Sequence, residues 1–165
     1  MLMLTILVIG AATLLVSSLS RSGAKIERDR KTLAALAQAK NALISYAITY
    51  GDTHSGEVHG FLPCPDNAGG NPEGSAELSC GKENVSRIGR LPWKALGLTT
   101  LRDGNGECLW YAVSGTYKNN PKADLMNWDN NGLLEILDAN GVTVAQNVVA
   151  VVFAPGAVLR NQNRA

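Results

Sequence analysis

The hydrophobic pattern of the first fifty residues predicts one long helix with two different halves. Residues 1–20 carry no charged side chain and are mostly apolar. A helix of about 20 residues is just long enough to cross the hydrocarbon layer of a bilayer. Residues 24–50 contain neither Gly nor Pro, and their apolar side chains recur near the helical repeat. We therefore predict a transmembrane or assembly helix over 1–20 that continues as an amphipathic helix over 21–50.

The apolar stripe of the second half indicates that this half packs on a globular core. The stripe comprises Leu33, Leu36, Leu43, Ala47 and Tyr50, with Ile44 and Ile48 beside it. We expect these side chains to cover the inner face of a sheet. Gly51, followed by polar turn residues, predicts the end of the helix.

The rest of the chain predicts a loop-rich region followed by a small sheet. Residues 51–106 are dense in Gly, Pro and Asn, whereas 107–165 contain short apolar runs bounded by turn residues. The predicted strands are Glu107–Ser114, Leu133–Leu137, Val142–Ala145 and Val148–Ala154, with Asn140-Gly141 as a hairpin signal. The predicted fold class is α+β, with an antiparallel sheet of about four strands on the second half of the helix.

The cysteines favour a disulfide over a metal site. Cys64 and Cys80 lie in the loop-rich region, where cross-linking them would stabilise the fold by about 3 kcal/mol. Together with His54 and His59 they supply the ligand types of a zinc site, but not the spacing of a finger or ribbon. We predict a Cys64–Cys80 disulfide, and Cys108 as a buried free thiol.

Charge and composition exclude several function classes. The net charge of +1, from 15 basic and 14 acidic side chains, lacks the basic surplus of a nucleic-acid binder. With 2 histidines there is little material for acid–base chemistry, and no nucleophile, base and orienting residue can be combined. We therefore expect neither an enzyme nor a cofactor, and no nucleic-acid partner.

Two signals disagree about the orientation in the membrane. Arg21, Lys25 and further basic residues follow the span, which would hold this flank in the cytoplasm. The cysteines favour an oxidising compartment instead. A basic leader preceding Met1 would resolve the conflict. A cleaved signal peptide is the alternative, with small residues at Ser18 and Ser20, but an anchor is favoured because residues 1–4 contain no basic side chain.

Four sequence blocks carry a resemblance to a known family. They are Phe61–Asp66, Gly89–Leu98, Leu109–Ser114 and Val152–Gly156. With the long helix and small sheet, the chain resembles the type IV pilins and type II secretion pseudopilins, and the blocks resemble a prepilin-like family of Gram-negative bacteria. That superfamily has a basic leader ending in Gly and a Glu five residues into the mature helix, neither of which precedes Leu4. We expect both to have preceded the present start, and the chain to continue past residue 165.

The resemblance implies a structural subunit of a type IV pilus or type II secretion filament. Such a subunit is held in the inner membrane with its C-terminal domain in the periplasm, or stands in an extracytoplasmic filament, and its partners are other pilin or pseudopilin subunits. We expect close helix packing at the small residues Gly10, Ala11, Ala12 and Ser17. The alternative is a membrane-anchored periplasmic binding module or enzyme with a ligand site around Trp93, Trp110 and Trp128. Neither the filament system nor a major or minor role follows from the residues.

A calcium loop is a further alternative. Asn127, Asp129, Asn131 and Asp138 match ligand positions one, three, five and twelve of an EF-hand loop. Residues 133–137, however, have the pattern of a strand, so an Asx-rich turn is favoured. Some pseudopilins bind calcium in a loop at the sheet edge, which keeps calcium as the only cofactor to consider.

Overall fold

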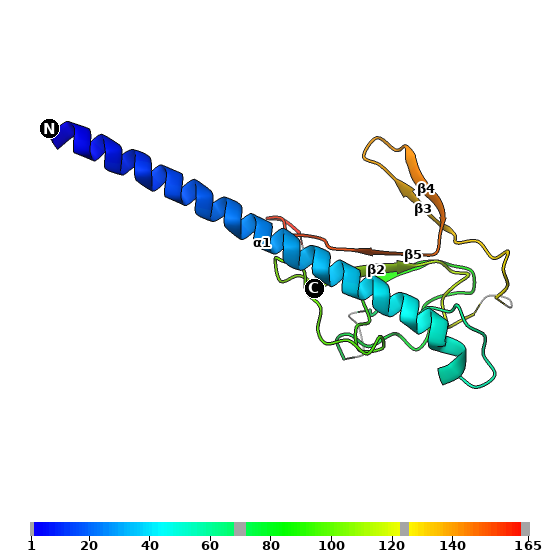
Figure 1. The fold of residues 1–165 in the computed structure, drawn as a ribbon. Coiled ribbons are helices and arrows are strands. Elements are labelled where there is room, and N and C mark those ends of the chain that lie inside the picture. Colours follow the sequence, from blue (N-terminus) through cyan, green and yellow to red (C-terminus); the bar gives the residue numbers. More distant parts are fainter. Residues whose placement is uncertain (1, 68–71, 123–125, 163–165) are drawn as a thin grey trace.

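The protein consists of one long helix with five short strands beside its C-terminal half (Figure 1). The computed structural model describes residues 2–67, 72–122 and 126–162, with side chains from residue 22 onward. The elements are α1 (Leu2–Thr53), β1 (Arg87–Arg90), β2 (Trp110–Val113), β3 (Leu134–Leu137), β4 (Thr143–Val148) and β5 (Ala150–Phe153). The predicted α+β class, with a helix on small antiparallel sheets, is confirmed at this level.

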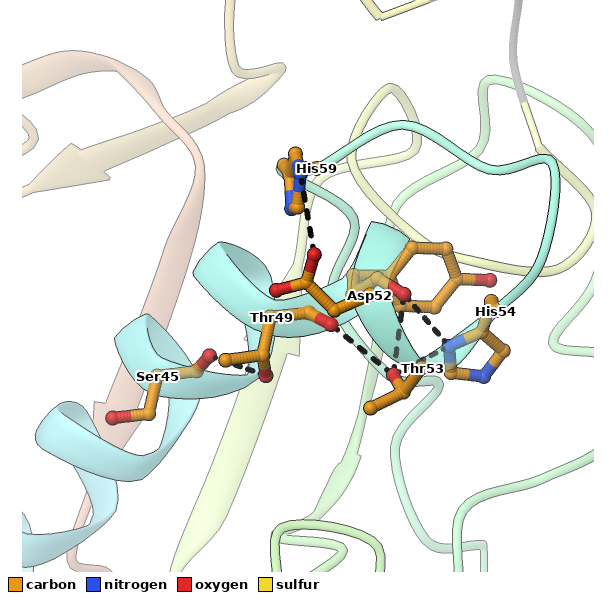
Figure 2. Close-up of polar contacts among 7 residues, drawn as sticks. Ser45, Thr49, Asp52, Thr53, His54 and His59 are labelled. Carbon is orange, nitrogen blue, oxygen red and sulfur yellow. Dashed lines mark hydrogen bonds and ion pairs between the residues drawn. The ribbon is translucent and has the colours of Figure 1, made fainter.

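Helix α1 is 52 residues long and passes through Gly51 before it ends at Thr53. The predicted end before Gly51 is wrong because this glycine serves a close contact rather than a helix cap. A Cβ at Gly51 would lie 2.8 Å from the carbonyl oxygen of Glu57 and 3.1 Å from the His59 ring. The last carbonyls of α1 are satisfied locally, since the Thr53 hydroxyl donates to Thr49 and Tyr50 at 3.2 Å (Figure 2).

The strands form two sheets, not the single four-stranded sheet that the pattern predicts. A three-stranded antiparallel sheet has the order β1-β2-β5, and β3 pairs with β4 as a separate hairpin. Near the end of β4, just before the chain passes into β5, Asn147 adopts a φ of 55°. Gly132 lies against the Val148 carbonyl, too close for any side chain. Figure 1 shows the hairpin projecting away from the rest of the strands.

Small side chains bring α1 close to the three-stranded sheet. The buried core cluster comprises Ala35, Ala39, Leu43, Leu62, Leu91, Leu109, Tyr111 and Val113. Leu36 and Ala47 pack against it, but Leu33 is 67% exposed and Ile44 50% exposed. Their predicted burial is wrong because the contact face of α1 is centred on the alanines, which permit a closer approach than large side chains would.

The contact between α1 and the domain continues as far as a turn at residues 103–106. The amide of Gly104 donates to the Thr32 hydroxyl at 2.9 Å, and Gly104 lies against the Arg28 backbone. Asp103 holds this turn, since its Oδ1 accepts from the amides of Asn105 and Glu107 at 2.8 and 2.9 Å. The part of α1 that precedes this contact extends beyond the strands (Figure 1).

Within the described part of the chain, no helix segment is long and apolar enough to span a membrane. The predicted span, residues 1–20, lies outside the residues whose side chains are described.

Leu43 lies in the contact face of α1 and Leu33 lies outside it, so substitutions of these two leucines test the arrangement. We expect Leu43→Ala to lower the free energy of unfolding by about 2–5 kcal/mol, because it leaves a cavity between α1 and the sheet. Leu33→Ala should change it by less than about 0.5 kcal/mol, since this side chain is exposed. Urea unfolding of the full chain in detergent micelles measures both. Equal losses would contradict the observed rotation of α1.

Candidate functional site

An apolar groove runs between α1, β5 and the β3–β4 hairpin. Its volume is about 680 Å³. Leu36, Leu43 and Ala47 of α1 form one wall, Ala150 and Val152 of β5 line it, and Ile136 of the hairpin closes it from the other side. Lys40 is the one charged side chain among the described residues that line it. The groove is open to solvent along one side, and its lining fits an apolar occupant.

Strand β5 lies at the edge of its sheet and borders this groove. The amide of Ser114 donates to the Val149 carbonyl at 2.8 Å, so these two residues, which lie directly next to the β2–β5 register, form a hydrogen-bonded pair. In an antiparallel ladder the alternate residues Ala150 and Val152 then direct their peptide groups away from β2. Residues 148–154 contain no Lys, Glu or Pro, the residue types that usually protect a sheet edge.

Helix α1 carries a second apolar stripe that does not contact the domain core. Ile26, Leu33, Ile44 and Ile48 are 67, 67, 50 and 63% exposed. Their spacing keeps them on one side of the helix over roughly 33 Å. Arg30 lies between the first two on this side, with its guanidinium bound to Glu27 at 3.0 Å. A row of exposed apolar side chains along this length of helix is typical of an interaction surface.

The β3–β4 hairpin also exposes apolar side chains to solvent. Leu133, Leu137, Val142 and Val144 are each more than half exposed. Glu135 accepts a hydrogen bond from the Thr143 hydroxyl at 2.5 Å across the two strands. A two-stranded hairpin is marginally stable by itself, and an exposed apolar surface on such a hairpin indicates that a further element covers it.

The four residues of the calcium alternative occupy two separate turns. Asp138 lies in the hairpin turn, where its Oδ1 accepts from the amides of Asn140 and Val142 at 2.8 and 2.9 Å. These backbone hydrogen bonds lower the pKa of the Asp138 carboxyl. In the other turn, Asn127 accepts from the Asp129 amide at 3.2 Å. Turn hydrogen bonds thus account for the side chains of Asn127 and Asp138, and the backbone carbonyl of Asn131 accepts from the Thr116 hydroxyl at 2.8 Å.

No group of three or more His, Cys, Asp or Glu side chains that could hold a metal occurs within residues 22–67, 72–122 and 126–162. Calcium binding at the Asn127, Asp129, Asn131 and Asp138 set stays an alternative for experiment.

The loop-rich region is held by the predicted disulfide. Cys64 and Cys80 are bonded and fully buried, which confirms the predicted pairing and removes both thiolates from the zinc alternative with His54 and His59. Cys108 is free but half-buried, not buried as predicted. Its sulfur accepts a hydrogen bond from Arg102 at 2.7 Å, and Arg102 also binds Glu73 at 2.5 Å.

Burial raises the pKa of the Cys108 thiol, against the opposing effect of the Arg102 charge. A thiol with a raised pKa is protonated at neutral pH and is a poor nucleophile. The geometry around Cys108 therefore supports a packing role.

A buried lysine beside the disulfide is a feature that the sequence analysis does not anticipate. Lys118 is fully buried, and its ammonium group donates to the carbonyls of Cys80, at 2.9 Å, and Lys82. Desolvation lowers the pKa of this lysine. No sequence signal marks it, because its neighbours are the polar residues of an ordinary loop. Through these hydrogen bonds Lys118, which follows β2, holds the backbone of residues 80–82.

The two histidines follow the C-terminal end of α1 and contact its last turn (Figure 2). His54 stacks on Tyr50, with ring centroids 4.0 Å apart, and its Nδ1 lies 3.0 Å from the Tyr50 carbonyl. The Nε2 of His59 is 3.9 Å from Oδ1 of Asp52. Thr49 donates its hydroxyl to the Ser45 carbonyl at 2.9 Å, so the polar side chains here serve the helix backbone.

The three tryptophans occupy different environments. Trp93 packs against the core, Trp110 stacks on Phe153 of β5, and Trp128 is 96% exposed. The ligand site predicted around them stays an alternative.

Comparisons with protein-family models, with characterised proteins and with solved structures find no match for this chain. Its function therefore rests on its own residues and geometry.

Thiol counting tests the cysteine assignment. The unfolded, unreduced chain should contain one reactive thiol, because Cys64 and Cys80 are bonded and Cys108 is free. After reduction it should contain three, and Cys108→Ser should remove the single thiol of the unreduced chain. Three thiols before reduction would refute the disulfide.

Chelation tests the calcium alternative. If hydrogen bonds alone hold the two turns, a calcium chelator should leave the melting temperature unchanged, in both the parent chain and Asp129→Ala. Thermal melts with chelator and with added calcium measure this. A loss of several degrees that calcium restores in the parent, but not in Asp129→Ala, would establish a calcium site.

Proposed function

We propose that the protein is a structural subunit, pilin-like or pseudopilin-like, that assembles through the N-terminal part of α1 into a type IV pilus or type II secretion filament. The observation that supports this proposal most directly is the division of α1. Its contacts with the domain reach Thr32 and Arg28, whereas the helix begins at Leu2. Figure 1 shows the N-terminal part of this 52-residue helix extending beyond the strands of the domain.

A helix segment of this composition favours an apolar environment. Residues 2–20 have no charged side chain, so exposing them to water is unfavourable, whereas lipid or a bundle of like helices can accommodate them. Transfer from lipid to a bundle changes little apolar exposure, so close packing provides the attraction. Small residues at Gly10, Ala11, Ala12 and Ser17 would permit it, although their side chains lie outside those that the structure describes.

The disulfide supports an extracytoplasmic location for the domain. Disulfides persist in oxidising compartments such as the bacterial periplasm and are rare in the cytosol. The Cys64–Cys80 bond and its fully buried sulfurs fit a domain on the periplasmic side of the inner membrane, or in a filament outside it. In this function the protein works by packing, and we propose no catalytic step.

Substitution in the N-terminal helix tests assembly. In a Ser17→Cys, Cys108→Ser background, a bismaleimide should link neighbouring copies in membranes into covalent dimers. Gly10→Leu should reduce the dimer fraction several-fold, because a large side chain prevents close backbone approach. Val8→Leu is the matched control, since it enlarges an apolar side chain outside the small-residue set. Unfolding of the domain should be the same in all variants.

Monomers throughout would favour the alternative of a membrane-anchored binding module or enzyme. Dimers that Gly10→Leu leaves undiminished would contradict packing at the small residues.

A further inference from the structure

We propose that the groove between α1 and the β3–β4 hairpin of one copy receives residues 22–33 of α1 from a neighbouring copy. This inference rests on the proposed self-assembly and adds a second contact to it, in the domain rather than in the apolar end of the helix. It accounts for two apolar features with one partner: the groove and the N-terminal part of the second apolar stripe of α1, at Ile26 and Leu33.

The shape and lining of the groove favour a helix as its occupant. One of its walls is a straight stretch of α1 and the other is formed by β5 and Ile136. Apart from Lys40, the described residues that line it are uncharged. A long element with a narrow apolar stripe can lie along such a surface. Among the described elements of this chain, α1 alone is long and carries such a stripe, at Ile26 and Leu33.

Charge complementarity selects the segment of α1. The hairpin region, residues 133–148, contains Glu135 and Asp138 and no basic residue. Residues 22–33 contain Lys25, Arg28, Arg30 and Lys31 against Glu27 and Asp29, a net charge of +2. Opposite potentials on two surfaces favour their association and fix its register. The acidic hairpin beside the groove would thus attract the basic part of α1 in the next copy, with Lys40 as the one like charge among the described residues that line the groove.

The geometry makes this contact head-to-tail. Ile26 and Leu33 precede the helix residues that line the groove, such as Leu43 and Ala47. One copy therefore contributes the groove, and the other contributes the N-terminal part of its second apolar stripe. The copy that contributes the groove keeps its own stripe unused, and the copy that contributes the stripe keeps its own groove unused. A heterologous contact that does not close into a ring continues as a filament.

Cross-linking between two differently tagged copies of the full chain tests the contact in membranes. Both copies carry Cys108→Ser, one has Ile26→Cys and the other Ile136→Cys, and a short bismaleimide is the probe. We expect covalent dimers when the two are expressed together, several-fold above either copy alone. Leu78→Cys replaces Ile26→Cys in the matched control. Leu78 is 85% exposed in the disulfide-bonded loop, so its thiol is accessible and should not form dimers with Ile136→Cys.

The outcomes separate this contact from the proposed function. Dimers of Ile26→Cys copies alone, in the absence of Ile136→Cys, would mean that the helices pair face to face and would overturn the head-to-tail arrangement. Absence of the mixed dimer, while Ser17→Cys copies still cross-link, would overturn the groove contact and leave assembly through the N-terminal helix intact. Absence of both would refute both proposals. Lys40→Cys, exposed in the wall of the same groove, repeats the test if Ile136→Cys unfolds.

Discussion

The fold depends on the close contact between α1 and the three-stranded sheet. Ala35 and Ala39 lie at its centre, where their small side chains allow the helix backbone to approach, and Leu43 fills the adjoining space. The larger side chains of the core cluster, including Tyr111 and Val113 of β2, pack around this contact. The rotation of α1 about its own axis is therefore set by the alanines. This rotation leaves the second apolar stripe, which includes Ile26 and Leu33, exposed.

Among its described residues, the region between α1 and β2 contains a single four-residue strand, β1, and polar and covalent links hold it in addition to buried side chains such as Leu62 and Leu91. The disulfide closes it, Lys118 binds two of its carbonyls, and the hydroxyl of the buried Tyr111 donates to the Pro63 carbonyl at 3.2 Å. Burial raises the pKa of Tyr111 well above its usual value, so this donor keeps its proton across the physiological range. The hydrogen bonds of Lys118 and Tyr111 satisfy buried carbonyl groups that would otherwise be unpaired.

The sequence predicts the elements better than their arrangement. The uninterrupted helical pattern identifies α1, and the Asn140-Gly141 turn identifies the hairpin, because both signals are local. Strand β1 was missed because its four residues, Arg87–Arg90, include two arginines and a glycine. The division into two sheets depends on the backbone conformation at Asn147, and the burial of Lys118 on a tertiary contact with Cys80. No propensity or periodicity marks such features, since they arise only when distant segments meet.

The partners of α1 in the core come from late positions in the chain, and this affects the order of events during synthesis. The helix emerges first, but β2 and β5 follow more than fifty residues after its end. Non-local contacts of this kind form slowly, and a nascent chain that waits for them exposes apolar surface. A bilayer that takes up the first twenty residues would hold the chain at the membrane during that interval. Insertion before folding would then protect the translating protein from aggregation, with the membrane acting in place of a chaperone.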